Sequence, residues 1–236
     1  MQLERILQQQ GFGSRRQCRA LVLAGRVQVQ GARCEDPSAD PDTDGLRFSV
    51  DGVEWPYMAF ATVLLHKPAG YECSREPQHH ASVLELLPAP LRLRGVQPVG
   101  RLDQDSTGLL VLTDDGALNH ALASGRRGIT KTYRVQTRHP VDELQQEALL
   151  AGVVLRDSPQ PVRGLACELL GERELRIVVA EGRYHQVKRM LAAVGNRVEA
   201  LHREAIGALR LPADLAPGAW RWLEAPQKDA LLAPSP

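Results

Sequence analysis

The sequence predicts an α+β protein built on a mixed, largely antiparallel sheet, with a small separate domain in front of it. From residue 59 onward, runs typical of strands alternate with runs typical of helices. The strand-like runs are 61–65, 108–112, 133–137 and 175–179, and the helix-like runs are 82–87, 117–124, 141–151 and 185–194. Several strands are too closely or too irregularly spaced for a regular βαβ series, so a mixed sheet fits better.

The first 31 residues read as two short helices followed by a strand. Apolar residues recur at helical spacing over residues 3–7. Ser14 and Gln17 are placed to form a capping box, in which Ser14 accepts from the amide of Gln17 and the Gln17 side chain reaches back. We expect this second helix to end at Gly25, which tolerates the left-handed conformation. Residues 26–30 then alternate like a half-buried strand.

Charge is unevenly distributed in a chain whose formal net charge is only +1. Residues 1–31 carry five arginines and one acid, and residues 117–141 carry five basic residues and no acid. At about 100° per residue, Arg15, Arg16 and Arg19 share about a quarter to a third of the helix circumference. Local basic patches on a nearly neutral protein can bind a polyanion such as nucleic acid, although a single run can also be a solvated helix face.

Three segments are expected to lie outside regular structure. Residues 36–45 are rich in Asp, Pro and Gly and read as a loop. Residues 54–57 are the expected linker, which gives a first domain over 1–55 and a second over 58–232. The tail, residues 225–236, contains prolines and is expected to fray.

The four cysteines are scattered, without a C-x-x-C pair or histidines at zinc-finger spacing. This pattern argues against a disulfide framework and a metal site and suits a reducing compartment. The chain start has no apolar signal core, and the apolar runs are too short to span a bilayer. We therefore expect a cytoplasmic protein with no membrane partner.

The run GRLDQDSTGLLVLTDDG, residues 100–116, places Asp103 on a turn just before an apolar strand. A buried strand holds such a turn rigidly, which suits a catalytic group. Asp105 reads as a turn former, and Asp114 with Asp115 as the cap of the following helix. These acids could also bind a divalent metal, but no histidine joins them in sequence.

Residues 1–55 resemble the S4 RNA-binding domain. The resemblance rests on the arginine-bearing helix, the G-R-V entry to a strand and the closing V-D-G at residues 50–52. A small helical domain with a chance basic face is the alternative.

Three further motifs in order resemble the core motifs of the pseudouridine synthases: residues 100–116, the Lys131–Thr132–Tyr133 strand and EGRYHQVKRM at 181–190. The match is most similar to the Rsu branch, which modifies small-subunit (16S) ribosomal RNA; synthases of large-subunit (23S) RNA share the same core. His66 and Ser106 depart from the usual pattern of that branch, which weakens the target assignment more than the activity.

The resemblance implies that Asp103 is the catalytic aspartate, Tyr133 the aromatic neighbour of the target base and Lys188 the basic partner of Asp103. Pseudouridine formation conserves all atoms, so no cofactor is expected. Asp103 could attack the sugar, attack the base or promote an elimination. Lys188 would favour its ionised form, and the Tyr133 hydroxyl could act as a general base.

Other side chains are expected to contact RNA once the uridine leaves its stack. Arg101 would fill the vacated space or hold a flanking phosphate, unless it is a surface arginine paired with Asp105. The remaining expected contacts are Arg15, Arg16, Arg19, Arg26, Arg183, His185, Gln186 and Arg189. The expected partner is ribosomal RNA or an assembly intermediate, bound by a monomer. Two other hypotheses remain at this point, a non-catalytic assembly factor and a metal-dependent phosphodiesterase.

Overall fold

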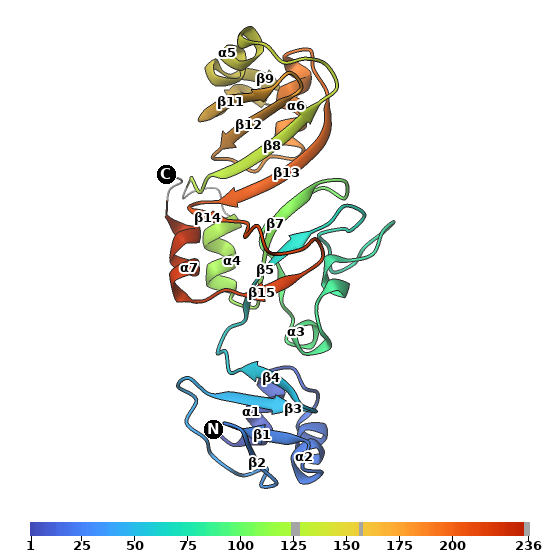
Figure 1. Cartoon of the computed structure of the whole chain (residues 1–236), viewed down its shortest axis with the longest axis vertical. Helices are drawn as coiled ribbons and strands as arrows, with labels where there is room; N and C mark the ends of the chain where they lie inside the picture. Colours follow the sequence, from blue (N-terminus) through green and yellow to red (C-terminus); the bar gives the residue numbers. More distant parts are fainter. Residues whose placement is uncertain (124–127, 156–157, 234–236) are drawn as a thin grey trace. The chain divides into compact units, whose positions relative to one another are not determined.

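The computed structural model describes residues 1–123, 128–155 and 158–233, and the chain divides into two compact units (Figure 1). The first unit comprises Met1–Ala61 together with Leu87–Val96, and the second comprises Thr62–Leu86 together with Gln97–Pro236. Each unit has its own sheet and its own hydrophobic core.

The first unit contains helices α1 (Leu3–Gln9) and α2 (Arg15–Leu23) and a four-stranded antiparallel sheet in the order β2-β1-β3-β4. The strands are β1 (Val27–Val29), β2 (Ala32–Arg33), β3 (Arg47–Val50) and β4 (Val53–Pro56). The predicted capping box of Ser14 and Gln17 is confirmed, and Gly25 beyond the helix end has a φ of +65°. Leu3, Cys18 and Phe48 are among the side chains that fill the core between helices and sheet.

The prediction of a linker at residues 54–57 is wrong for the first three residues, which belong to β4. Trp55 pairs with Phe48 across the sheet, and its ring packs edge-on against Phe12 at a centroid distance of 5.4 Å. This aromatic contact buries apolar surface that a solvated linker would leave exposed. Pro56 is tolerated because it ends an edge strand.

A short helix from later in the chain also belongs to the first unit. Helix α3 (Ala89–Leu93) follows a proline at its N-cap. Just beyond it, Arg94 donates to the Gln10 side chain at 2.6 Å and to the carbonyl of Met58 at 2.9 Å. These bonds join α3 to the end of α1.

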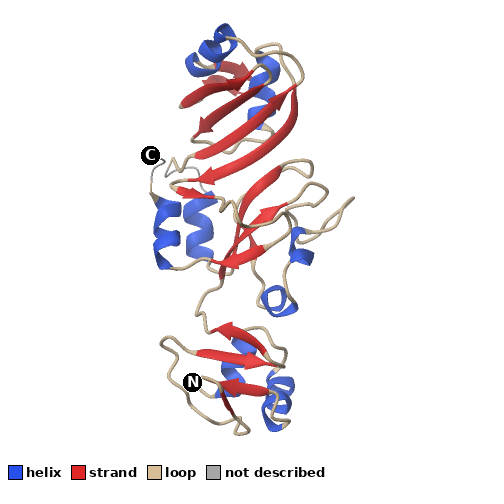
Figure 2. Ribbon diagram, viewed as in Figure 1, coloured by secondary structure: helices blue, strands red, loops and turns tan. Residues whose placement is uncertain are grey.

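The second unit is built on a nine-stranded sheet, in the order β11-β12-β8-β13-β7-β5-β15, with β14 beside β13 and β6 beside β7 (Figure 2). Its strands are β5 (Thr62–Lys67), β6 (Gln97–Pro98), β7 (Thr107–Thr113), β8 (Lys131–Thr137), β11 (Ala166–Gly171), β12 (Glu174–Val179), β13 (Val198–Ile206), β14 (Leu209–Arg210) and β15 (Trp220–Trp222). All pairs within this sheet are antiparallel except β13 with β7. The predicted class, a mixed and largely antiparallel α+β fold, is confirmed.

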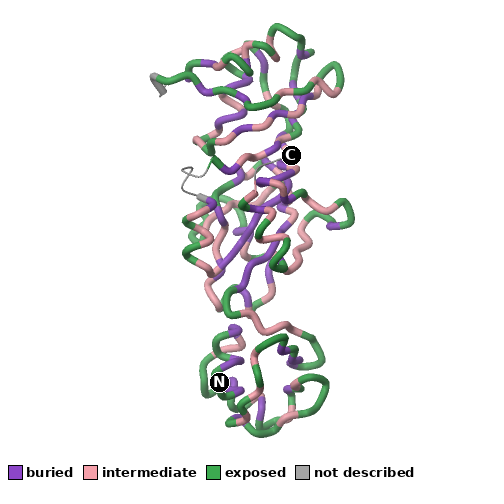
Figure 3. Tube along the Cα trace, turned by 90° about the vertical axis from the view of Figure 1, so that its left-hand side faces the viewer, coloured by how far each residue is buried: buried purple, intermediate pink, exposed green. Residues whose placement is uncertain are grey.

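Helices cover the two halves of this sheet separately. Helices α5 (Glu143–Ala151) and α6 (Gln186–Ala193), with the small pair β9 (Val153–Leu155) and β10 (Ser158–Val162), pack on the β8–β12 half. Helices α4 (Gly116–Ala123) and α7 (Ala225–Leu232) pack on the β5–β7 half (Figure 1). Buried residues run through the central strands (Figure 3). Strand β13 contributes to both cores, with Leu201 in the first and Ile206 in the second.

The tail expected to fray instead forms α7 over its described residues. Glu224 and Gln227 make a reciprocal capping box, and a proline stands in the first turn. Leu231 is fully buried in the same core as Leu109 and Leu223. Burial of this leucine anchors a segment that its prolines alone would suggest is loose. No helix among the described residues has the length and apolarity needed to cross a membrane.

Candidate active site

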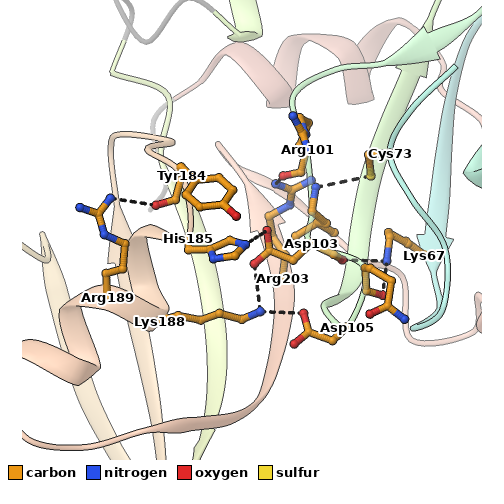
Figure 4. Close-up of polar contacts among 12 residues, drawn as sticks. Lys67, Cys73, Arg101, Asp103, Asp105, Tyr184, His185, Lys188, Arg189 and Arg203 are labelled. Atoms are coloured by element: carbon orange, nitrogen blue, oxygen red, sulfur yellow. Dashed lines mark hydrogen bonds and ion pairs between the residues drawn. The ribbon is translucent and has the colours of Figure 1, made fainter. Parts of the chain in front are cut away.

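The turn that carries Asp103 lies between β6 and β7 and is closed by the Ser106 amide, which donates to the Asp103 carbonyl at 3.1 Å. Lys67, at the end of β5, binds the backbone of this turn, and none of its surface is exposed. Its Nζ donates to the carbonyls of Asp103 (3.0 Å), Gln104 (3.2 Å) and Ser106 (2.7 Å) (Figure 4). Burial lowers the pKa of Lys67. The buried ammonium thus binds three backbone carbonyls of the Asp103 turn, which satisfies its own donors.

The other side of the turn rests on β13. Gly108 pairs with Arg203 in the parallel pairing, and a Cβ on Gly108 would lie 2.3 Å from the Arg203 carbonyl oxygen. Only glycine permits so close an approach. The Arg203 guanidinium donates through Nε to the Leu109 carbonyl at 2.8 Å, and its Nη1 lies 3.5 Å from the Arg101 carbonyl.

The Asp103 carboxylate meets two basic side chains from residues 185–188 (Figure 4). Lys188 Nζ lies 3.0 Å from Oδ2, and His185 Nε2 lies 3.2 Å from Oδ1. The Asp103 and Lys188 side chains are 26% and 23% exposed, so the pair is only partly screened by water. His185 precedes α6 with φ 48° and ψ 33°, a left-handed conformation that directs its ring at the carboxylate.

Lys188 is shared with a second carboxylate. Its Nζ lies 2.6 Å from Oδ1 of Asp105. Burial raises the pKa of Asp105, but the hydrogen bond and charge of Lys188 lower it further, so the net shift is downward. Burial lowers the pKa of Lys188, and bonds to Asp105 and Asp103 outweigh it, so the net shift is upward. The site therefore favours the charged forms of Asp105 and Lys188.

A cavity of about 610 Å³ opens beside this cluster. Its walls come from the Asp103 turn, from β8 and β13, and from residues 181–187. They include Arg101, Asp103, Ser106, Lys131, Tyr133, Arg183, Tyr184, His185, Gln186 and Arg203. Asp103 and Tyr133, which the sequence places 30 positions apart, thus line one cavity. Its size suits a nucleoside rather than a macromolecular surface.

Comparison with known proteins identifies the fold that surrounds this cavity. Residues 61–193 match the model of the RNA pseudouridylate synthase family, and residues 1–42 match the S4 domain. The chain belongs to the RNA pseudouridylate synthase family.

Relatives and a solved structure agree with this assignment. The synthase is 38% identical to the ribosomal small subunit pseudouridine synthase A of Yersinia pestis over 236 residues, which cover 99% of each chain. It is 44% identical to the protein of the same name in Escherichia coli K12 over 158 residues, covering 67% of this chain and 68% of the relative. A crystal structure described as a pseudouridylate synthase superposes with a TM-score of 0.70 at 30% identity and covers 98% of this chain and 99% of that one. The predicted resemblance to an S4-bearing pseudouridine synthase is confirmed, and the chain is an RNA pseudouridine synthase.

Within the synthase, Arg101 is exposed and lines the cavity. The alternative in which it pairs with Asp105 is not seen, because Asp105 binds Lys188 instead. The guanidinium of Arg101 makes no hydrogen bond or ion pair to any residue that the structure describes. It is therefore available to a ligand, and its contact with RNA stays a prediction.

The expected RNA contacts beside Lys188 differ in how exposed their side chains are. Arg183 pairs with Glu181, and Arg189 donates to the Tyr184 carbonyl at 3.1 Å; both retain partial exposure. Gln186 lines the cavity but is more buried than these two arginines, and its contact with RNA stays a prediction. It is 6% exposed and accepts from the Arg183 amide at 3.0 Å, because it caps the turn that leads into α6.

Most of the arginines expected to bind RNA in the first unit already have acidic partners. Arg15 and Arg19 lie 2.6 and 3.3 Å from Glu4, whose carboxylate side chain is only 4% exposed. Arg26 pairs with Asp51 through two bonds of 2.6 Å. Arg16 is exposed and makes no ion pair among residues 1–123, 128–155 and 158–233. Of this set, Arg16 offers the freest positive charge.

Sequence reasoning missed four residues of the site. Lys67 and Arg203 hold the Asp103 turn, Lys131 lines the cavity, and the Tyr184 ring stacks on His185 at 3.8 Å while remaining 70% exposed. The buried lysine and arginine gave no local signal, because their partners are distant backbone carbonyls. Lys131 and Tyr184 stood inside quoted motifs and could have been read as cavity residues.

No group of three or more His, Cys, Asp or Glu that could hold a metal is found in the part of the chain that the structure describes.

Proposed function

We propose that this synthase isomerises one specific uridine of 16S small-subunit ribosomal RNA to pseudouridine, with Asp103 as the catalytic carboxylate and without a cofactor. The observation that carries the proposal is the Asp103 carboxylate itself, held by Lys188 and His185 on the wall of a nucleoside-sized cavity. The names of relatives from Yersinia pestis and Escherichia coli support the small-subunit target.

The geometry supports a division of labour in the cavity. The target uridine leaves its stack and enters base first, because no side chain reaches the glycosidic bond of a stacked base. Asp103, whose Oδ2 lies 3.0 Å from Lys188 Nζ, meets the positive charge that develops at C1′ of the ribose or attacks that carbon. Tyr133 packs against the uracil. Breaking the N1–C1′ bond and forming the C5–C1′ bond conserves every atom except one exchanged proton.

The first unit supplies RNA affinity in this proposal. Residues 1–55 act as the RNA-binding domain and residues 58–232 as the catalytic domain. Arg16 contacts a phosphate directly, whereas Arg15, Arg19 and Arg26 present charge that their acidic partners partly offset. The protein acts as a monomer in the cytoplasm, and sedimentation with and without RNA tests the oligomeric state.

A chemical map of pseudouridine in ribosomal RNA tests the proposal. Purified protein should convert one uridine of 16S RNA, free or in an assembly intermediate, and none of 23S RNA. Asp103→Asn should lower turnover by at least about 10³-fold while RNA affinity is retained. The control is Asp229→Asn on α7, which removes an exposed carboxylate that does not line the cavity. Conversion of 23S RNA alone would reject the target, and an active Asp103→Asn enzyme would reject the catalytic role.

A further inference from the structure

The cavity contains a lysine that the proposed roles of Asp103, Tyr133 and Lys188 leave unused. Lys131 and Tyr133 lie two residues apart on β8, so their side chains project from the same face of the sheet, and both line the cavity. Lys131 is partly buried, and its ammonium has no hydrogen bond or ion pair to a residue within the described ranges. A lysine enclosed in this way without a partner is uncommon.

A second unpartnered donor lies on the neighbouring strand. Arg203 on β13 stands directly across from Tyr133 and is 3% exposed. Its Nε and Nη1 face backbone carbonyls, but its Nη2 is buried without a partner. Ser106 Oγ, also in a residue of the cavity wall, is likewise buried and unpartnered. Such atoms are normally satisfied, so this cluster indicates a bound group that supplies oxygen acceptors.

The reaction itself creates a need for cations at this place. When the N1–C1′ bond breaks, its electron pair stays with the uracil and spreads over N1, O2 and O4. Asp103 balances the charge left on the ribose. After the base turns, an electron pair of C5 forms the new bond to C1′, the C5 proton leaves, and N1 takes up a proton. No oxidant or reductant is required, but the detached uracil is an anion.

We propose that Lys131 and the free Nη2 of Arg203 form a cationic subsite that binds the carbonyl oxygens of the uracil and stabilises its negative charge when the glycosidic bond breaks. The inference rests on the proposed entry of uridine beside Asp103. It assigns Lys131 a role in the chemical step, through preorganised charge aimed at the leaving group.

The partial burial of Lys131 favours a base over a phosphate as the occupant of the subsite. The pKa of Lys131 is lowered, first by burial and then by the nearby Arg203. The base enters the cavity, whereas the phosphates of the strand stay nearer to solvent, where Arg101 is exposed. A phosphate at Lys131 would require the backbone to enter ahead of the base.

Single-turnover kinetics and RNA binding across a range of salt concentrations test the subsite. Lys131→Met should slow conversion by about 10²- to 10³-fold. Its affinity for RNA should stay within about twofold of wild type, with an unchanged dependence on salt. Lys131→Arg, which keeps a cation, should recover part of the rate. Lys228→Met on α7 is the matched control and should behave as wild type.

Each alternative result has a definite meaning. A normal rate in Lys131→Met, with Asp103→Asn inactive, rejects the subsite and leaves the proposed function intact. Weaker binding with a salt slope reduced by about 0.7 to 0.9 would assign Lys131 to a phosphate and also rejects the subsite. Activity in Asp103→Asn would reject the proposed function instead. If Lys131→Met is less folded by circular dichroism, Lys131→Gln provides the same comparison with a polar side chain.

Discussion

The His185 Nε2 atom lies 3.2 Å from Oδ1 of Asp103, and His185 reaches it from a left-handed backbone conformation with φ 48°. A residue other than glycine in this region costs about 1 to 2 kcal/mol, and asparagine tolerates it best. Such strain persists only where the surrounding structure imposes it. We therefore expect His185 to position the Asp103 carboxylate.

Replacing His185 should separate its backbone role from its ring. His185→Ala is expected to lose about 1 kcal/mol of unfolding free energy relative to His185→Asn, since asparagine accepts positive φ. Both variants should lose turnover to the same extent, because both lose the bond to Asp103. Urea unfolding and single-turnover assays give the two quantities. Equal stability of the two variants would show that the left-handed backbone carries no cost.

Lys188→Met should lower turnover by about 10²-fold or more, because it removes the cation shared by Asp103 and Asp105. The pKa of Asp105 should rise in this variant, since Lys188 is what lowers it against the effect of burial. NMR titration of the carboxyl carbon measures the pKa, and Lys228→Met is the control. A pKa of Asp105 that does not move would contradict the ion pair.

Arg16→Gln should weaken RNA binding and reduce the slope of log affinity against log salt by about 0.7 to 0.9, because one phosphate contact is lost. Arg47→Gln is the matched control in the same unit, since Arg47 is paired with Glu54 on the sheet. Fluorescence anisotropy at several salt concentrations checks both variants. An unchanged slope for Arg16→Gln would place this helix away from the RNA.

Protonation of His202 should lower the stability of the synthase in mild acid. Burial, then the neighbouring His66, lowers the pKa of His202, while Thr107 bonds its Nδ1 at 2.9 Å and Glu204 and Arg134 act on its charge in opposite directions. The folded state therefore favours the neutral ring. This contribution is complete above about pH 6.5 and is lost as the pH falls through the lower folded value.

Comparison with His202→Gln isolates that contribution. For each protein, the loss of unfolding free energy between about pH 7.5 and about pH 5 is measured. The carboxylates contribute equally to both proteins, so the difference between the two losses reports His202. The variant should lose less stability on acidification. A parallel pH dependence in the two proteins would show that His202 does not titrate with folding.

Local chemistry made several elements predictable. The Ser14–Gln17 box fixed the start of α2, and the Asp115 side chain accepts from the amides of Ala117 and Leu118 as the expected cap of α4. The apolar run at residues 108–112 became β7, a buried central strand. In each case the determining residues lie within a few positions of one another.

Features that depend on contacts between distant parts of the sequence could not be predicted. β13 joins β7 to β8, but its charged residues, such as Glu199 and Glu204, hide the strand pattern. Without β13, nothing in the sequence places Arg203 behind the Asp103 turn. Likewise, Glu4 was visible as an acid, but its near-complete burial between Arg15 and Arg19 depends on how α1 packs on α2.

The distribution of lysines makes the site open to chemical footprinting. The chain has four lysines: Lys131 lines the cavity, Lys67 and Lys188 contact Asp103, and Lys228 on α7 remains as an internal reference. An amine-selective reagent should spare the enclosed Lys67 until the Asp103 turn opens. The rate of Lys67 modification, measured by mass spectrometry, would therefore report the opening of that turn. Occupation of the cavity would be reported separately by the shielding of Lys131.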